Sequence, residues 1–283
     1  MSLTETGTLV ADAARSGGAV LAFNVITLEH AEGIVLGLEA AGLSGILQVS
    51  ENAVRFHGGR MPPVVAACRE IAASAGVPVS VHLDHVQDLG LARTVVGDAE
   101  RLGISSLMVD AAHLEYEENV VTTGDIAEAG HRASLWIEAE LGEIGGKDGA
   151  HAPGVRTDPG EAASFVARTG VDGLAVAVGS SHAMTTATAE LDLGLIARLT
   201  DLVPVPLVLH GSSGVPLPAL RAAVANGIRK INVGTALNLG YTAQVRRFLD
   251  ADGSVTDPRK YLAPAREAVR DVVDELCTEV LCG

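Results

Sequence analysis

Residues 77–88 read VPVSVHLDHVQD, and this stretch decides how the rest of the chain is interpreted. It begins as an apolar, β-branched run behind a proline, which is typical of a strand that is buried on both faces. It ends in the polar residues His82, Asp84 and His85. A buried strand that ends in two imidazoles and a carboxylate indicates a scaffold that carries reactive groups to one rim.

Apolar runs of the same kind recur along the chain, and amphipathic, alanine-rich stretches separate them. We expect strands at Val20–Asn24, Ile46–Ser50, Val79–Leu83, Ser106–Asp110, Leu135–Glu140, Gly173–Val178, Leu207–His210 and Lys230–Val233. We expect helices at Leu28–Ala41, Pro63–Ala75, Leu89–Leu102, Glu117–Arg132, Pro159–Thr169, Leu191–Leu202, Pro218–Asn226, Thr235–Leu249 and Pro264–Leu281. This alternation predicts an α/β fold, namely a (β/α)8 TIM barrel with an additional C-terminal helix.

The barrel is expected to form a single domain over residues 1–283, because no linker or low-complexity segment interrupts the pattern. A doubly wound open sheet is the alternative, but its dinucleotide-binding glycine fingerprint is missing from the sequence. The one long irregular segment, Leu141–Asp158, is rich in glycine. It predicts an active-site loop, with a segment of no function as the alternative.

The composition limits the partners of this chain. It has 20 basic and 35 acidic residues, a net charge of −15. Such a surface repels nucleic acid and anionic membranes, so we expect neither as a partner. No apolar run reaches the ~20 residues of a membrane span, and the N-terminus lacks the features of a signal peptide. Three cysteines without metal-binding spacing favour a reducing, cytoplasmic location.

Polar residues gather where the predicted strands end, which is where a barrel of this kind has its active site. These positions carry Asn24, Ser50, His82, Asp84, His85, Asp110, Glu138, Glu140, His182, His210 and Asn232. A lone histidine at a strand end is more often structural than a ligand, but several on one rim favour metal binding. Three imidazoles suit a borderline-soft divalent cation such as zinc. We predict that His85, His182 and His210 bind it, and that His82 orients one of these ligands.

Two turns rich in glycine and serine, at Gly179–Ser181 and Gly211–Gly214, lie close to this rim. Together with the start of the helix after Asn232, they offer backbone N–H groups of the kind that bind phosphate. Barrels frequently bind phosphate beside strands seven and eight. We therefore favour a phosphate site here, with ordinary tight turns as the alternative.

Motifs on most of the strands resemble the class II, zinc-dependent ketose-bisphosphate aldolases, which include the fructose- and tagatose-bisphosphate aldolases. The motifs are AFN (22–24), HLDH (82–85), VDAAH (109–113), EAELGEIGG (138–146), VGSSH (178–182), LVLHGSSG (207–214), KINVGT (230–235) and DPRKYLAPAREA (257–268). They cover almost the whole chain in order, so the resemblance is specific for the fold and the type of reaction. It is less specific for the substrate.

The resemblance implies a reversible cleavage of a ketose bisphosphate, first of all fructose 1,6-bisphosphate, to dihydroxyacetone phosphate and an aldehyde. Tagatose 1,6-bisphosphate and a phosphorylated deoxy-ketogluconate are the alternative substrates. It also implies a catalytic zinc ion on His85, His182 and His210, with Asp84 as the acid/base group. Asp110 and Glu140 resemble residues that hold a second divalent or a monovalent cation. The implied substrate contacts are Asn24, Ser50, Gly211, Ser213, Asn232, Gly234 and Thr235.

The expected chemistry needs a group that stabilises an enediolate, which is either a metal ion or a Schiff-base lysine. Lys147 lies in the glycine-rich loop, Lys230 begins a predicted strand, and Lys260 lies beyond the strands, so the lysine mechanism is disfavoured. A second base must move the proton on carbon. Asp148 stands where the family has a glutamate, and we expect it, or Glu143 in its place, to be that base. A solvated turn residue is the alternative.

Two other functions remain open at this point. A metal-dependent hydrolase would be expected to show an HxH pair at one strand end, whereas this chain has HxDH. A non-catalytic barrel subunit of an aldolase complex is the other alternative. The C-terminal helix is expected either to pair subunits in a homodimer or homotetramer, or to pack on its own barrel.

Overall fold

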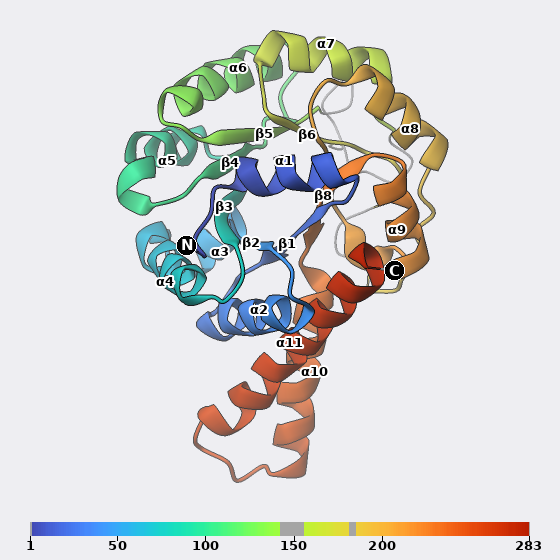
Figure 1. The fold of residues 1–283 in the computed structure, drawn as a ribbon. Helices are drawn as coiled ribbons and strands as arrows, with labels where there is room; N and C mark the ends of the chain where they lie inside the picture. Colours follow the sequence, from blue (N-terminus) through green and yellow to red (C-terminus); the bar gives the residue numbers. More distant parts are fainter. Residues whose placement is uncertain (1, 142–155, 181–184, 283) are drawn as a thin grey trace.

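The computed structural model of the protein describes residues 2–141, 156–180 and 185–282. Within these residues, eight parallel strands close into a barrel in chain order. The strands are β1 (Val20–Asn24), β2 (Gly45–Ser50), β3 (Val79–Val86), β4 (Ser106–Val109), β5 (Trp136–Glu140), β6 (Gly173–Ala175), β7 (Leu207–Leu209) and β8 (Ile228–Val233). The predicted TIM barrel with a C-terminal helix is confirmed (Figure 1).

The first helix precedes β1, and the other helices follow strands and surround the barrel (Figure 1). They are α1 (Thr6–Ser16), α2 (Leu28–Ala41), α3 (Glu51–Phe56), α4 (Met61–Ser74), α5 (Leu89–Leu102), α6 (Tyr116–Arg132), α7 (Pro159–Thr169), α8 (Leu193–Leu202), α9 (Leu217–Ala225), α10 (Thr235–Ala251) and α11 (Arg259–Leu281), with a short 3-10 turn at Ser212–Gly214. Helices α1 and α3 were not predicted. Helix α11 begins five residues before Pro264, and a proline is easily mistaken for a helix start because it is favoured there.

Two strands differ from the prediction by three residues: β6 ends at Ala175 instead of Val178, and β3 continues through His85 to Val86 instead of ending at Leu83. Leu83 pairs with Leu107 and Val86 pairs with Val109, so Asp84 and His85 together face one residue of β4. This is a β-bulge, and His85 in it has a positive φ of 47°. Successive side chains of a regular strand point to opposite faces. The bulge allows Asp84 and His85 to face the same site.

Helix α1 lies across the end of the barrel where the strands begin (Figure 1). Its Leu9 and Val10 pack with Val20, Ala22 and Ile46 of the first two strands. Thr6 is fully buried, and its hydroxyl lies 3.0 Å from Ser80 Oγ and accepts a hydrogen bond of 2.6 Å from Ser106 Oγ. The amino-terminal end of the barrel is therefore closed by apolar packing and by a small hydroxyl cluster.

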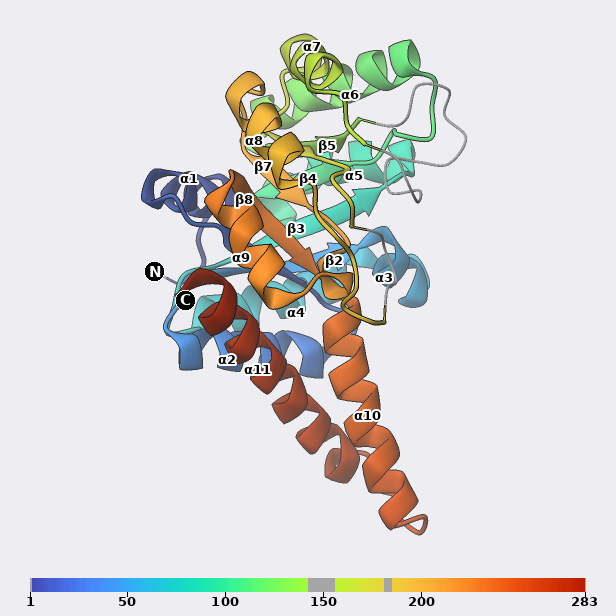
Figure 2. The ribbon, with the colours of Figure 1, turned by 90° about the vertical axis from the view of Figure 1, so that its right-hand side faces the viewer.

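Helices α10 and α11 form a hairpin whose far end extends away from the barrel (Figure 2). Nearer the barrel, α11 packs against α2, where a Cβ atom on Gly33 or Gly37 would lie 2.6 Å from an atom of α11. These glycines thus allow the two helices to approach closely, and α11 packs on its own barrel. Among the described residues, no helix is both long and apolar enough to span a membrane.

Candidate metal centre and active site

Two histidines meet at the carboxyl end of the barrel. His85 Nε2 of β3 lies 2.8 Å from Nδ1 of His210, which follows β7, and the two rings are nearly perpendicular. One carboxylate oxygen of Asp84 belongs to the same group, whose ligand atoms all lie within 4.8 Å of one another. His210 is fully buried, whereas the side chain of His85 is 25% exposed. The group is therefore open to solvent on the side of His85.

Two further carboxylates lie on the other side of the His85 ring. Asp110 Oδ2 lies 3.1 Å from His85 Nδ1, and Glu140 Oε2 lies 4.0 Å from the same nitrogen. Asp110 Oδ2 also accepts a hydrogen bond of 2.9 Å from the Gln87 side chain. The predicted second set of cation-binding residues, Asp110 and Glu140, is thus joined to the first set through His85.

These carboxylates determine the charge of His85 in the metal-free protein. Burial lowers the pKa of His85, but the negative charges of Asp84, Asp110 and Glu140 outweigh it and raise the pKa to about 10. Burial likewise raises the pKa of Asp110, but the hydrogen bonds from His85 and Gln87 lower it to about 2. We therefore assign an imidazolium that donates from Nδ1 to Asp110 and from Nε2 to His210.

Asp84 is held by amide groups from the neighbouring strand β2 and from β8 across the barrel. Its Oδ1 accepts a hydrogen bond of 3.2 Å from Asn232 Nδ2, and its Oδ2 lies 3.5 Å from Gln48 Nε2. The Gln48 amide also donates to Asn24 Oδ1, so Asn24 belongs to the same network. Burial raises the pKa of Asp84, while the charges of His85 and Lys230 act in the opposite direction.

A buried ion pair lies beneath the two histidines. Glu138 Oε1 is 2.9 Å from His210 Nε2, and Glu138 Oε2 is 2.9 Å from Lys230 Nζ. The Lys230 ammonium also donates to Asn232 Oδ1 at 2.6 Å. Because a carboxylate can only accept, Nε2 of His210 donates to Glu138, and Nδ1 of that ring is the acceptor that faces His85. Lys230 is fully buried in β8, which starts at Ile228 and not at Lys230 as predicted.

The predicted phosphate-binding residues lie together beside the ends of β7 and β8. Gly211 has a positive φ of 68° and begins the 3-10 turn. Ser213 Oγ accepts a hydrogen bond of 3.0 Å from Ala236 N, next to Thr235 in the first turn of α10. A Cβ atom on Gly234 would lie 3.1 Å from the Asn24 amide nitrogen. The 3-10 turn and the start of α10 therefore lie beside Asn24, which belongs to the hydrogen-bond network of Asp84.

Ser50 does not join this cluster through its side chain, and three other predicted residues lie outside the described part of the chain. Ser50 Oγ accepts a hydrogen bond of 3.2 Å from Ala53 N, so it caps α3. His182 and Asp148 lie outside the described residues, as does Glu143. His82 forms no described hydrogen bond with His85 or His210, because its Nδ1 lies 2.8 Å from Ser106 Oγ and its Nε2 is buried without a hydrogen-bond partner.

Several residues of the site were not among the predicted site residues. Gln48, Glu138 and Lys230 are fully buried polar residues of β2, β5 and β8. Each of them stands two positions before a polar residue at a strand end, namely Ser50, Glu140 and Asn232. Because side chains two apart share one face of a strand, this spacing would have placed all three inside the barrel.

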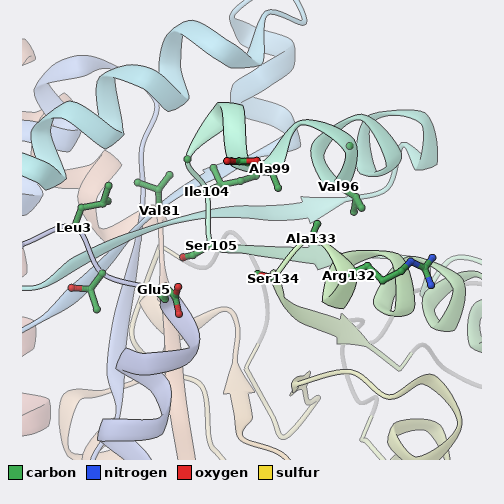
Figure 3. A pocket seen from close by; sticks show the side chains of 14 residues that line it. Leu3, Glu5, Val81, Val96, Ala99, Ile104, Ser105, Arg132, Ala133 and Ser134 are labelled. Carbon is green, nitrogen blue, oxygen red and sulfur yellow. The ribbon is translucent and has the colours of Figure 1, made fainter.

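A cavity of about 580 Å³ lies elsewhere, beside the amino-terminal ends of β3, β4 and β5. Its walls include Leu3, Val81, Ile104 and Arg132 (Figure 3). Arg132 already pairs with Glu128 of its own helix, and Ser105 of the same cavity pairs with Thr6. The cavity therefore offers nothing to the chemistry at the opposite end of the barrel.

The donor atoms at the carboxyl end suit a divalent cation. Two imidazole nitrogens 2.8 Å apart need a proton or a cation between them, because two lone pairs at that distance repel each other. Nitrogen and carboxylate oxygen are ligands that zinc and similar ions accept. The hydrogen bond from each histidine to a carboxylate resembles the outer contacts that orient metal-binding imidazoles in proteins. The residues present therefore fit a metal ion.

A TIM barrel with imidazoles and carboxylates at the carboxyl ends of its strands is the architecture of a metal-dependent enzyme. Comparison with known families then identifies the class. The family described as fructose-bisphosphate aldolase class-II matches residues 4–282. The chain belongs to this family, and it is a carbon–carbon lyase that acts on ketose bisphosphates. The resemblance seen in the motifs is confirmed.

Individual relatives agree with this assignment. A fructose-bisphosphate aldolase of Geobacillus stearothermophilus is 37% identical over 277 residues, which are 96% of this chain and 95% of the relative. The crystal structure of the YdjI aldolase from Escherichia coli K12 has a TM-score of 0.81 at 29% identity and covers 98% of this chain and 97% of its own. A fructose-bisphosphate aldolase from Campylobacter jejuni has a TM-score of 0.85 at 20% identity over 99% of this chain and 95% of its own, which supports the fold alone.

Proposed function

We propose that the protein is a zinc-dependent aldolase that cleaves fructose 1,6-bisphosphate to dihydroxyacetone phosphate and an aldehyde, and catalyses the reverse condensation. One observation carries the proposal: His85 and His210 place two ring nitrogens 2.8 Å apart, with an oxygen of Asp84 within 4.8 Å. In the proposal, His182 is the third zinc ligand. Asp110 and Glu140 hold a second divalent or a monovalent cation beside His85.

A bound divalent cation supplies positive charge for the enediolate that cleavage of the carbon–carbon bond produces. Lys230 does not replace it as a Schiff-base nucleophile, because its ammonium is buried between Glu138 and Asn232. The same contacts give Lys230 another task, which is to keep Glu138 against His210 and Asn232 against Asp84.

Asp84 is the proposed acid/base group for the hydroxyl next to the bond that breaks. Its carboxylate removes the hydroxyl proton in cleavage and returns it to the aldehyde oxygen in condensation. Burial raises the pKa of Asp84 in the metal-free protein, and a cation bound beside it would act in the opposite direction and favour the carboxylate form that removes the proton. The amides of Asn232 and Gln48 hold its two oxygens in place. Asp148 is proposed as the base that transfers the proton at the enediolate carbon, with Glu143 as the alternative base.

The phosphate of dihydroxyacetone phosphate is proposed to lie against Gly211, Ser213, Asn232, Gly234 and Thr235. The start of α10 supports this, because a helix N-terminus attracts anions with its free N–H groups and its dipole. Asn24 is proposed to contact the substrate beside Gly234. Ser50 remains a candidate substrate contact through its backbone, because its hydroxyl already caps α3.

The choice of ketose is supported by the name of the relative that is 37% identical, a fructose-bisphosphate aldolase. Tagatose 1,6-bisphosphate and a phosphorylated deoxy-ketogluconate are the competing substrates. Cleavage rates of the purified enzyme with all three sugars would decide. We expect the highest kcat/KM for fructose 1,6-bisphosphate, and a higher value for either competitor would contradict this choice.

The test of the site itself is Asp84→Asn. The asparagine keeps the shape of the side chain but cannot take up the hydroxyl proton, so kcat should fall by about 10²–10⁴-fold. Zinc content and the unfolding transition should stay close to those of the unchanged enzyme. An unchanged kcat in this variant would show that another group moves the hydroxyl proton.

A further inference from the structure

We propose that Glu51 is a positioning residue of the metal centre, which holds the turn after β3 and thereby fixes the ring of His85. The inference rests on the proposed function, because it assigns Glu51 a role toward a histidine that is proposed to bind metal. Glu51 itself contacts neither the substrate site nor the ring of His85 through any described hydrogen bond, and it acts through two intermediate residues.

The location of Glu51 is unusual for a carboxylate. It is the first residue of α3, and it directly follows Ser50, whose register partner in β3 is Asp84. Glu51 is only 4% exposed. Carboxylates are almost never so deeply buried unless they are paired. A carboxylate buried beside the end of β3 is therefore expected to have hydrogen-bond partners that compensate its charge.

One oxygen of Glu51 holds two consecutive backbone groups of the neighbouring turn. Oε2 accepts hydrogen bonds from Gln87 N at 2.6 Å and from Asp88 N at 2.8 Å. The other oxygen accepts from Arg55 of the same helix. Hydrogen bonds to an ionised acceptor are stronger than those between neutral groups. Glu51 thus fixes the chain at the two residues that directly follow β3.

From Gln87 the contacts continue to the metal centre. The Gln87 side chain donates a hydrogen bond of 2.9 Å to Asp110 Oδ2, and the same oxygen lies 3.1 Å from His85 Nδ1. The orientation of Asp110 and of the His85 ring therefore depends on where the backbone of Gln87 is held. A hydrogen bond to the distal nitrogen of an imidazole is what orients a metal-binding histidine.

The backbone of His85 needs such support. Its φ of 47° lies in the left-handed region, which residues with a side chain seldom adopt. On the β4 side, Asp110 N donates to Val86 O at 3.0 Å. On the β2 side, Glu51 holds Gln87 and Asp88. The bulge that directs His85 to the site is thus held on both sides by residues that directly follow the neighbouring strands, Glu51 after β2 and Asp110 after β4.

The test measures metal binding as well as turnover in four single variants of the full chain and in the double variant Glu51→Ala/Gln87→Ala. These are Glu51→Ala, Glu51→Gln, Gln87→Ala and, as the matched control, Arg55→Ala, which removes the ion-pair partner of Glu51 but leaves the turn. Zinc affinity of the metal-free protein is measured by competition with a chromophoric chelator. The visible absorption spectrum of the Co²⁺-loaded protein reports the geometry of the ligands.

We expect Glu51→Ala to weaken zinc binding about 10–100-fold and to change the Co²⁺ spectrum. Glu51→Gln should stay close to the unchanged protein, because an amide oxygen can still accept from Gln87 N and Asp88 N. Gln87→Ala should reproduce the effect of Glu51→Ala, and the double variant should add little to either one. Arg55→Ala should leave affinity and spectrum unchanged.

Three results would overturn the inference. The first is a folded Glu51→Ala protein with unchanged zinc affinity and spectrum. The second is an equal loss in Arg55→Ala, which would indicate a role in helix α3 alone. The third is unchanged zinc affinity in Gln87→Ala. This result would overturn the inference even if Glu51→Ala does not fold. If the unchanged protein binds neither zinc nor Co²⁺, the proposed function fails first, and this inference fails with it.

Discussion

At the scale of single residues, the site depends on a few polar groups that are buried in pairs. Lys230 and Glu138 are both fully buried and lie 2.9 Å apart. Each of them also holds a residue of the proposed active site, Asn232 and His210. An ion pair of this kind is costly to break, because removal of one partner leaves the other charge uncompensated in the barrel interior.

We therefore predict that Lys230→Met destabilises the metal-free protein by about 3–5 kcal/mol. The double variant Lys230→Met/Glu138→Gln should be more stable than the sum of the two single changes predicts, because the stranded charge is gone. Urea denaturation of the four proteins measures both quantities. A loss below about 1 kcal/mol in Lys230→Met, or strict additivity, would contradict the role given to this pair.

At the scale of elements, the unpredicted helix α1 provides the floor of the barrel. Its Thr6 hydroxyl lies among the hydroxyls of Ser80, Ser105 and Ser106. His82 in turn lies 2.8 Å from Ser106. The helix therefore joins the start of the chain to β3 and β4 through one buried polar cluster.

Thr6→Val keeps the shape of the side chain and removes the hydroxyl, so Ser106 loses its acceptor. We predict a decrease of about 1–3 kcal/mol in the free energy of unfolding, measured in urea. Thr8→Val is the matched control, since Thr8 is exposed on the same helix. The cluster would have no stabilising role if both variants unfolded at the same urea concentration.

Much of this architecture could be predicted from the sequence, and the exceptions have physical causes. The strand β1 and the helices α2, α5 and α7 have the predicted bounds, because apolar period and capping residues mark their ends. The bulge in β3 leaves no local mark, since it depends on pairing with β4. The C-terminus of helix α1 has recognisable sequence signals, namely Arg15 in its last turn and Gly17 as its cap. The helix was missed because the prediction started from the strand pattern, and α1 precedes the first strand.

The candidate site could be predicted in part for a similar reason. The barrel brings the carboxyl ends of its strands together, and the residues at or next to these ends include Asp84, His85, Asp110, Glu140, His210 and Asn232. The supporting residues are harder to find. Gln87 and Glu51 follow strand ends in sequence, and only the β2–β3 register explains why they meet.

At the scale of the whole molecule, the hairpin of α10 and α11 extends off the barrel (Figure 2). Leu239 and Leu249 on α10 are 46% and 39% exposed. We propose that the hairpin contributes to a homodimer or homotetramer, since apolar residues on a projecting element are often covered by a partner. Sedimentation velocity should give two or four chains per particle. A monomer at micromolar concentration would contradict this assembly.

The central claim is that aldol cleavage depends on a metal ion held at His85 and His210. The most direct measurement is the metal content and the rate of fructose 1,6-bisphosphate cleavage in one sample, before chelation, after chelation and after zinc is returned. We predict that activity is lost together with the metal and recovers when zinc binds again. Full activity in protein shown to be free of metal would contradict the account.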